Sequence, residues 1–217
     1  LNCVANGRLL REGPFEDIWI QPAAGDAGGA VGAALAVAYT EKPLRTVASH
    51  GDAMHGAYLG PAYDDETIVA CLESHNAAYE SLDDDTLSDR VAGILAEDKV
   101  VGWFQGRMEF GPRALGNRSI LGDARSPAMQ RMLNLKIKYR ESFRPFAPSV
   151  TREDVGEYFD LDTDSPYMLI VADVKEERRQ SVSEDDLSRT GIDQLDVVRS
   201  DIPAVTHVDH TARAQTV

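Results

Sequence analysis

One segment of the chain, residues 109–119, constrains the fold more than any other because it can form neither a regular helix nor a regular strand. Its sequence is Glu109-Phe-Gly-Pro-Arg-Ala-Leu-Gly-Asn-Arg-Ser119. The Gly-Pro and Gly-Asn steps in it are typical of turns. The segment therefore predicts an irregular loop that carries Arg113, Arg118 and the hydroxyl of Ser119. Guanidinium groups are well suited to bind phosphate and carboxylate oxygens, which they can grip in pairs.

The loop lies in a cationic stretch of an otherwise acidic chain. Residues 107–144 contain nine Lys or Arg and three Asp or Glu, whereas the whole chain of 217 residues has a formal net charge of −14. We expect this stretch to form a site for a small, strongly anionic ligand. The alternative is that its basic residues pair with the acidic residues of the protein surface, and composition alone does not decide between the two.

The composition limits the class of protein. The chain has 43% hydrophobic and 27% charged residues, as globular proteins do, and no run of 18 apolar residues predicts a membrane span. We expect no secretion signal, and the two isolated cysteines, Cys3 and Cys71, favour a reducing, cytoplasmic location. A composition rich in Asp and poor in Lys is typical of salt-adapted organisms. The acidic balance counts against a general nucleic-acid-binding protein.

The order of residues predicts a mixed α/β chain. A strand at 15–20, a glycine-rich turn at 23–29 and a helix at 30–39 form an arrangement that commonly binds nucleotide phosphates. Gly7 is expected to cap the end of a preceding helix. The other expected elements are helices at 65–72, 86–97 and 128–140, strands at 100–104, 167–171 and 207–217, and a connection between domains at 41–64.

The expected helix at 128–140 carries several of the basic residues. At 100° per residue, one face of it is apolar and predicts core positions at Ala128, Met132, Leu135 and Tyr139. A polar edge holds Arg131, Asn134 and Lys138, whereas Lys136 and Arg140 are expected on a solvated face. Lys138 is therefore the lysine that is expected to belong to a site.

Three separated motifs together resemble a known family. They are Gln21-Pro-Ala-Ala-Gly-Asp-Ala-Gly-Gly29, Phe110-Gly-Pro-Arg-Ala-Leu-Gly-Asn-Arg-Ser119 and Phe143-Arg-Pro-Phe-Ala-Pro148. In this order they closely resemble the O-carbamoyltransferases, the family of nodulation, cephamycin and tobramycin carbamoylation enzymes. The resemblance implies that residues 1–60 are the end of an actin-like ATPase-type domain. It also implies that residues 61–217 belong to a YrdC-like α/β domain that is truncated at its C-terminus.

The resemblance also implies a reaction in two stages. Carbamoyl phosphate and ATP, with Mg²⁺, give carbamoyladenylate and release pyrophosphate in the YrdC-like domain. The other domain then passes the carbamoyl group to a hydroxyl of a small molecule or a sugar. The chain begins inside one family motif and ends before another, so it is expected to be a fragment that does not catalyse the complete reaction alone.

Individual residues match the family's functional positions. The basic residues that hold carbamoyl phosphate and the adenylate are matched by Arg113, Arg118, Lys138, Arg144 and Arg213. Ser119 could donate a hydrogen bond to phosphate or simply cap a turn. The residues beside the nucleotide of the transfer domain are matched by Asn2, Gly25, Gly28 and Gly29. Asp26 matches a ligand of an iron-type divalent metal, although the two histidines that complete that site have no counterpart in this chain.

Other interpretations remain open from the residues alone. Asp26 could simply be a helix N-cap. His207 and His210 do not predict a metal pair, because a strand would direct them to opposite faces. The rival function is a YrdC-like nucleotide- or RNA-binding module without catalysis. The acidic balance and the lack of aromatic residues among the basic ones count against RNA.

Overall fold

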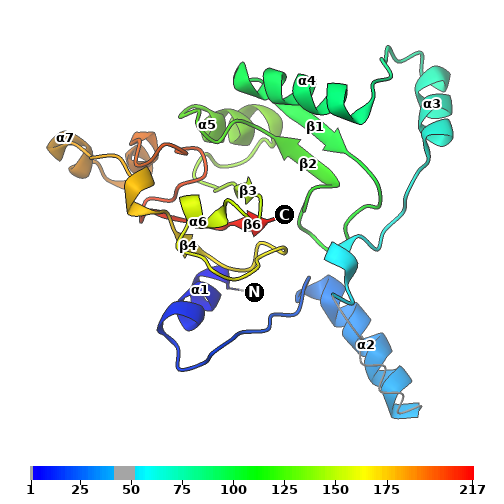
Figure 1. Ribbon diagram of the computed structural model, residues 1–217, viewed down its shortest axis with the longest axis horizontal. Helices are drawn as coiled ribbons and strands as arrows, with labels where there is room; N and C mark the ends of the chain where they lie inside the picture. Colours follow the sequence, from blue (N-terminus) through cyan, green and yellow to red (C-terminus); the bar gives the residue numbers. More distant parts are fainter. Residues whose placement is uncertain (1, 42–51) are drawn as a thin grey trace. The chain divides into compact units, whose positions relative to one another are not determined.

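The computed structural model describes residues 2–41 and 52–217, and it mixes helices with short strands (Figure 1). The prediction of a mixed α/β chain is confirmed at this level. The chain forms two compact units, one made of residues 1–20 and 122–217 and the other of residues 21–121. Part of the expected connection at 41–64, together with His50, lies outside the described residues.

The first unit contains most of the short elements. Its helices and helical turns are α1 (Cys3–Glu12), α5 (Met129–Met132), the π-helical turn η2 (Leu133–Ile137), α6 (Val155–Tyr158), η3 (Glu176–Arg178), α7 (Glu184–Leu187) and η4 (Gly191–Asp196). Its strands are β3 (Ser149–Val150), β4 (Ala172–Asp173), β5 (Thr211–Ala212) and β6 (Gln215–Thr216). Strand β3 pairs with β6 in parallel, and β4 pairs with β5 in the antiparallel direction.

A hydrophobic core fills the first unit. Phe159 and Val155 from the α6 region are each only 1% exposed, and they pack with Val174 beyond β4 and with Ala212 of β5. The unit thus joins strands that are far apart in the sequence through one apolar cluster. This cluster supports the loops that form the pocket described below.

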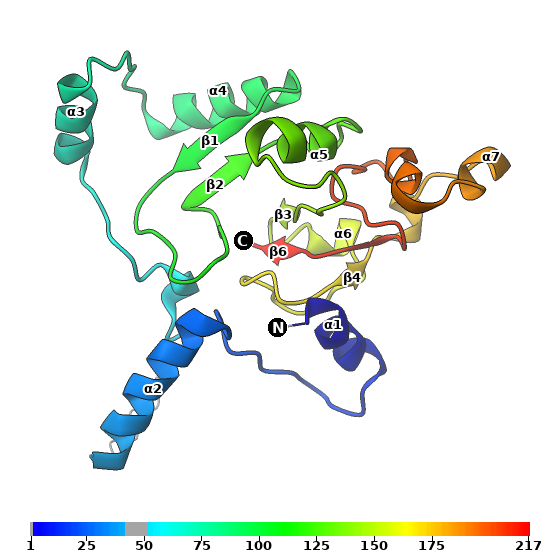
Figure 2. The same ribbon diagram turned by 180° about the vertical axis from the view of Figure 1, so that it is seen from behind.

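Helix α1 is held against the segment just before β4 (Figure 2). Gly7 is buried in the middle of α1, and a Cβ atom there would lie 2.1 Å from the Val171 carbonyl oxygen. Asn6 Nδ2 donates to the Leu169 carbonyl at 2.9 Å, and Arg11 Nη1 donates to the Val171 carbonyl at 2.9 Å. The prediction that Gly7 caps the end of a helix is therefore wrong. The glycine allows close packing rather than a left-handed turn.

Three of the expected strands are wrong or incomplete. Residues 15–20 form no strand in the described structure, and residues 167–171 are buried toward their end but bond to α1 instead of a strand ladder. In the expected strand at 207–217, residues 207–210 form a turn and the strand begins only at Thr211. Each of these segments has the composition of a strand, but strand formation requires a partner that sequence alone does not specify.

The second unit confirms the expected helices and the strand at 100–104, with bounds that differ by up to four residues because the first helix begins inside the expected glycine-rich turn. Its elements are α2 (Asp26–Glu41), the short 3₁₀ turn η1 (His55–Ala57), α3 (Asp65–Ser74), α4 (Asp84–Ala96), β1 (Val101–Phe104) and β2 (Arg118–Leu121). The side chains of Asp64 and Asp83 cap α3 and α4 by accepting from backbone N–H groups. Strands β1 and β2 form an antiparallel hairpin with α4 lying along it (Figure 1).

The helix expected at 128–140 is shorter and differently oriented. After α5 the chain continues as a π-helical turn, in which Lys138 N donates to the Leu133 carbonyl. The longer turn changes which side chains face inward, and Met129, Leu133 and Asn134 are buried. The predicted core positions Leu135 and Tyr139 are instead 45% and 85% exposed. The predicted apolar face is therefore wrong, and Asn134 lies inside the protein rather than on a polar edge.

No helix among residues 2–41 and 52–217 is both long enough and apolar enough to cross a membrane.

The packing of α1 gives a first test. Replacing Gly7 with Ala should reduce the free energy of unfolding by about 1–3 kcal/mol, because the new methyl group collides with a main-chain oxygen. Gly156→Ala in α6 is the matched control, since nothing lies within 4 Å of its would-be Cβ. That variant should be neutral or up to about 1 kcal/mol more stable. Urea unfolding measures both, and equal stability of the two variants would contradict the packing of α1.

Candidate functional site

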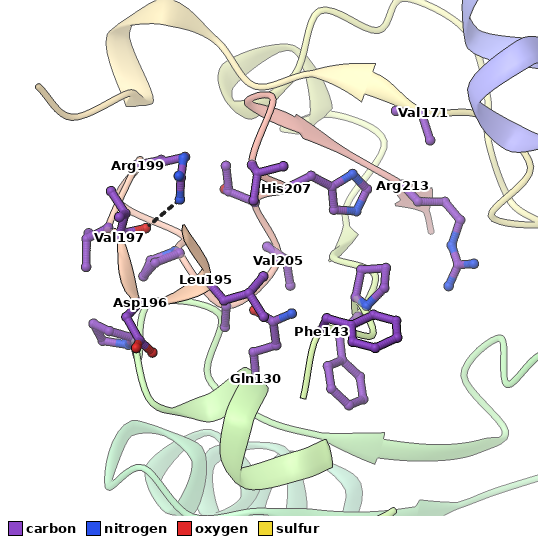
Figure 3. Close-up of a pocket in the computed structure, with 18 of the residues that line it drawn as sticks. Gln130, Phe143, Val171, Leu195, Asp196, Val197, Arg199, Val205, His207 and Arg213 are labelled. Carbon is purple, nitrogen blue, oxygen red and sulfur yellow. Dashed lines mark hydrogen bonds between the residues drawn. The ribbon is translucent and has the colours of Figure 1, made fainter. Parts of the chain in front are cut away.

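A cavity of about 460 Å³ lies within the first unit (Figure 3). Its walls come from five parts of the chain that meet there: the start of α1, the α5 region, residues 143–146, Val171 and residues 195–213. The polar and charged side chains that line it include Gln130, Asp196, Arg199, His207 and Arg213. Most of the remaining lining is apolar, as is common in sites for small ligands.

One wall of the pocket is fixed by the buried side chain of Asn134. Its Nδ2 atom donates to the carbonyls of Arg144 at 2.8 Å and of Ser142 at 3.1 Å. Gln130 Nε2 donates to the same Arg144 carbonyl at 3.3 Å. These bonds satisfy main-chain carbonyls of an irregular segment that no helix or sheet could satisfy. The segment therefore presents Phe143 to the pocket in a fixed position.

The same asparagine also positions a cation. Arg140 Nε donates to Asn134 Oδ1 at 2.6 Å, and the Arg140 guanidinium lies 4.9 Å from the centroid of the Phe146 ring. A cation over an aromatic face is a favourable contact. Arg140, which was expected on a solvated face, is thus half-buried and helps to hold the pocket wall.

A chain of three side chains forms another wall. Asp209 Oδ1 accepts from the Thr211 hydroxyl at 2.7 Å and from the Thr211 N–H at 3.1 Å. The Thr211 Oγ1 atom lies 2.9 Å from His207 Nδ1. Figure 3 shows the His207 ring extending toward the side of the pocket where Arg213 lies.

The charges around His207 determine its protonation. Burial lowers the pKa of the His207 imidazole, the Asp209 carboxylate raises it and the Arg213 guanidinium lowers it, with a net lowering. Burial raises the pKa of the Asp209 carboxyl, but the hydrogen bonds from Thr211, together with the nearby His207, lower it, with a net lowering. At neutral pH the wall therefore holds a carboxylate, a neutral imidazole and a guanidinium.

Among the predicted anion-binding residues of the first unit, Arg213 lines the pocket and two others do not. Lys138 is exposed at the end of the π-helical turn. The Arg144 side chain is 53% exposed and pairs with Glu141 at 3.0 Å, although its neighbours Phe143 and Pro145 line the pocket. The structure thus places Arg213 in the cavity, Arg144 in the chain segment that forms its wall, and Lys138 outside its lining.

The cationic loop in the second unit is organised around its own carboxylate. The Glu109 side chain is buried, and its Oε1 accepts from the N–H groups of Leu115 at 2.6 Å, Asn117 at 2.9 Å and Arg118 at 3.2 Å. Burial raises the pKa of the Glu109 carboxyl, but these hydrogen bonds and that from Arg118 lower it to about 2. The turns predicted from the Gly-Pro and Gly-Asn steps are what let three N–H groups converge on one oxygen.

Arg118 has a structural partner in this loop. Its Nε donates to Glu109 Oε2 at 2.9 Å, and its Nη2 donates to the Glu109 carbonyl at 3.0 Å. Ser119 Oγ accepts from the Gly116 N–H at 3.1 Å, the arrangement expected of a turn cap. Arg113 is half-buried and forms no ion pair within the described part of the chain. Pairing of this kind was the alternative left open for the basic residues, and it applies to Arg118.

Two family models match the sequence of the chain. The model described as the carbamoyltransferase C-terminus matches residues 92–217, which is more than half of the sequence. The chain belongs to the carbamoyltransferase family. A second model, described as the carbamoyltransferase N-terminus, matches residues 1–35. The resemblance inferred from the three motifs is confirmed, whereas a domain boundary near residue 60 stays a prediction.

Carbamoyltransferases and their relatives match over the whole chain. An uncharacterized protein of Synechocystis is 59% identical over all of this chain, which covers 36% of that protein. Nodulation protein NolNO of Sinorhizobium fredii is 41% identical over 100% of the chain and 29% of the relative. A 3'-hydroxymethylcephem-O-carbamoyltransferase of Streptomyces clavuligerus is 35% identical over 100% of the chain and 35% of the relative. The chain spans about a third of the length of these curated relatives.

The residues predicted to match the nucleotide site of carbamoyltransferases have local structural roles. Gly25 and Gly28 both donate their N–H groups to the Ala23 carbonyl, and the Gly29 N–H donates to the Gly25 carbonyl. A Cβ atom on Gly28 would lie 2.4 Å from the Ala23 oxygen, so the turn requires glycine there. In the first unit, Asn2 is the N-cap of α1 and accepts from the Ala5 N–H at 3.1 Å. Their match to nucleotide-binding positions stays a prediction.

The structure gives little support to the predicted match of Asp26 to a metal ligand. Asp26 begins α2 and is exposed, and the residues described by the structure contain no group of three or more His, Cys, Asp or Glu side chains that could hold a metal ion. One carboxylate does not make a metal site. The described part of the chain therefore does not by itself fit an iron-type centre. Asp26 is the first residue of α2 rather than the residue before it, so the N-cap alternative is not confirmed, although a carboxylate in the first turn of a helix is favourable.

Sequence reasoning missed three residues that shape the site. Glu109 was noted only as the start of the cationic segment, and Asn134 was placed on a polar edge. His207 was considered only as half of a metal pair. The Asp-x-Thr spacing at 209–211 is a local signal for a side-chain turn, but the contact of Thr211 with His207 depends on a turn where a strand was expected.

The Glu109 loop gives a pH-dependent prediction. The folded-state pKa lies below the usual 4.5, so the carboxylate stabilises the fold above that pH and the contribution is lost as pH falls toward 2. Relative to Glu109→Gln, wild type should lose about 2 kcal/mol of its free energy of unfolding as the pH falls from about 6 to about 3. Urea unfolding of both proteins across this range measures it. A pH-independent difference would contradict the hydrogen-bonded carboxylate.

The Asn134 junction gives a graded prediction. Asn134→Leu should reduce the free energy of unfolding by about 2–4 kcal/mol, because two carbonyls and the Arg140 guanidinium lose a buried partner. Gln130→Ala is the control, since it removes one longer bond of 3.3 Å and should cost less than about 1 kcal/mol. Hydrogen exchange at residues 142–146 should rise in the first variant and not in the second. Equal effects would show that Asn134 does not fix the wall.

Proposed function

We propose that the chain is part of an ATP-dependent O-carbamoyltransferase and that its first unit binds the carbamoyl-bearing anion. In this reaction water splits carbamoyl phosphate into carbamate and inorganic phosphate, and carbamate and ATP, with Mg²⁺, then give carbamoyladenylate and pyrophosphate. The carbamoyl group finally passes to an acceptor hydroxyl with release of AMP. The observation that carries the proposal is Arg213, a predicted anion-binding residue, in the wall of a cavity within a chain of this family.

Electrostatics supports an anion in this pocket. Carbamoyl phosphate and the phosphates of ATP repel each other at close range, so fixed cations must compensate their charge. Arg213 is a cation at the pocket, and the neutral His207 and apolar neighbours weaken its solvation. Reduced solvation strengthens the attraction of a guanidinium for phosphate oxygens. Positioning and charge stabilisation of this kind require no covalent nucleophile.

The other basic residues are assigned smaller or more distant roles. Arg144 and Lys138 are exposed and can rearrange toward a bound polyphosphate, with Asn134 holding the backbone of Arg144. Arg113 remains a candidate phosphate ligand in the second unit. Arg118 acts through Glu109, since its guanidinium donates to both the carboxylate and the carbonyl of that residue.

The proposal also assigns the two parts of the chain to two domains of a longer protein. We assign residues 61–217 to the YrdC-like, adenylate-forming part of a longer protein and residues 1–60 to its transfer domain. The acceptor is a hydroxyl of a small molecule or sugar, as the name of the Streptomyces relative indicates for that protein.

Binding of carbamoyl phosphate tests the anion site. In calorimetric titrations, Arg213→Gln should weaken binding by about 10- to 100-fold, because a charged hydrogen bond is lost. Lys138→Ala and Lys136→Ala form a matched pair, and only the first should weaken binding. Pyrophosphate release that depends on carbamoyl phosphate, measured in a protein of the relatives' full length, tests the chemistry.

Two outcomes would contradict the proposal. Unchanged affinity for carbamoyl phosphate in a folded Arg213→Gln variant would show that the anion does not bind in this pocket. Pyrophosphate release that is independent of carbamoyl phosphate would exclude the adenylate step.

A further inference from the structure

The hydrogen bonds around His207 determine where its proton lies. The Asp209 carboxylate only accepts hydrogen bonds, and it takes the single hydroxyl proton of Thr211 at 2.7 Å. The Thr211 oxygen can then only accept from His207 Nδ1, 2.9 Å away. The neutral ring therefore carries its proton on Nδ1. Its Nε2 atom has a lone pair and no proton.

This lone pair is buried and receives no hydrogen bond in the described part of the chain. Nε2 of His207 is inaccessible to solvent and has no hydrogen-bond partner among the described residues. The residue lines the cavity, and Arg213 lies near enough for its charge to affect the ring. A buried acceptor without a donor costs free energy that a suitable ligand can recover. The ligand expected here is an anion that also carries a hydrogen-bond donor.

We propose that His207 Nε2 accepts a hydrogen bond from the NH₂ group of the carbamoyl moiety, and that His207 thereby selects carbamoyl phosphate over acyl phosphates that lack this group. The inference rests on the proposed function, because it places the carbamoyl anion in the same pocket. Arg213 binds the phosphate end of the ligand, and His207 accepts a hydrogen bond from the NH₂ group at the other end. The asymmetry of the two side chains, a cation beside a pure acceptor, matches the asymmetry of the ligand.

Acetyl phosphate is the discriminating probe. It has nearly the same size and shape as carbamoyl phosphate, with a methyl group in place of NH₂, so it would leave the Nε2 lone pair unsatisfied. Sites that hydrogen-bond a substrate N–H or O–H reject analogues without that group far better than apolar pockets reject a missing methylene. We expect wild type to bind carbamoyl phosphate at least about tenfold more tightly than acetyl phosphate.

Two substitutions at one position separate the acceptor from the fold. In His207→Asn the side-chain amide can keep the bond to Thr211 that Nδ1 makes, but nothing replaces Nε2. In His207→Gln the longer amide places an oxygen near the Nε2 position. The preference for carbamoyl phosphate should fall roughly tenfold or more in the Asn variant and be largely kept in the Gln variant. His75→Asn, in an exposed position after α3, is the matched control and should leave the preference unchanged.

The titrations distinguish this inference from the proposed function. If wild type binds both phosphates equally, or if His207→Asn keeps the full preference, the inference about His207 is overturned while the anion site stands. If wild type binds neither, the assignment of the anion to this pocket is overturned and the inference falls with it. A preference lost in His207→Asn and kept in His207→Gln and His75→Asn establishes the acceptor role.

Discussion

The pocket depends on the fully buried side chain of Asn134. Its amide donates to the carbonyls of Ser142 and Arg144, and its oxygen accepts from Arg140. Irregular backbone can be buried only where something other than a helix or a sheet satisfies its polar groups. This one amide does so for the segment that carries Phe143 and Phe146 into the wall. The cavity, the stacked Arg140 and the position of Arg144 all follow from it.

Charge composition alone overstates how much of a cationic stretch can bind a ligand. In the second unit the N–H groups of the loop and the Arg118 guanidinium converge on Glu109, so an internal carboxylate already occupies the anion-binding geometry. In the first unit Arg213 lies beside a neutral imidazole in an open cavity. An anion-binding role therefore fits Arg213 better than Arg118, although both were predicted to match basic positions of the family.

Predictions from the sequence were correct where local interactions decide the structure. Helices α3 and α4, which follow capping aspartates, were predicted to within two residues, whereas the glycine-rich turn expected at 23–29 already gives way to α2 at Asp26. Strands at 15–20 and 167–171 failed because a strand needs a partner, and in the second case α1 takes its place. The family resemblance implied a role for Arg213, which lies outside the three motifs. The resemblance could not reveal His207, whose role depends on a turn at 207–210 and on burial in the folded chain.

The most direct test of the account is to locate bound carbamoyl phosphate by NMR, with the arginine and histidine side-chain nitrogens labelled. The account predicts saturable changes in the side-chain signals of Arg213 and of His207 Nε2, with the exposed Arg8 unaffected. Changes confined to the arginines of the loop at 109–119, with His207 and Arg213 silent, would contradict it.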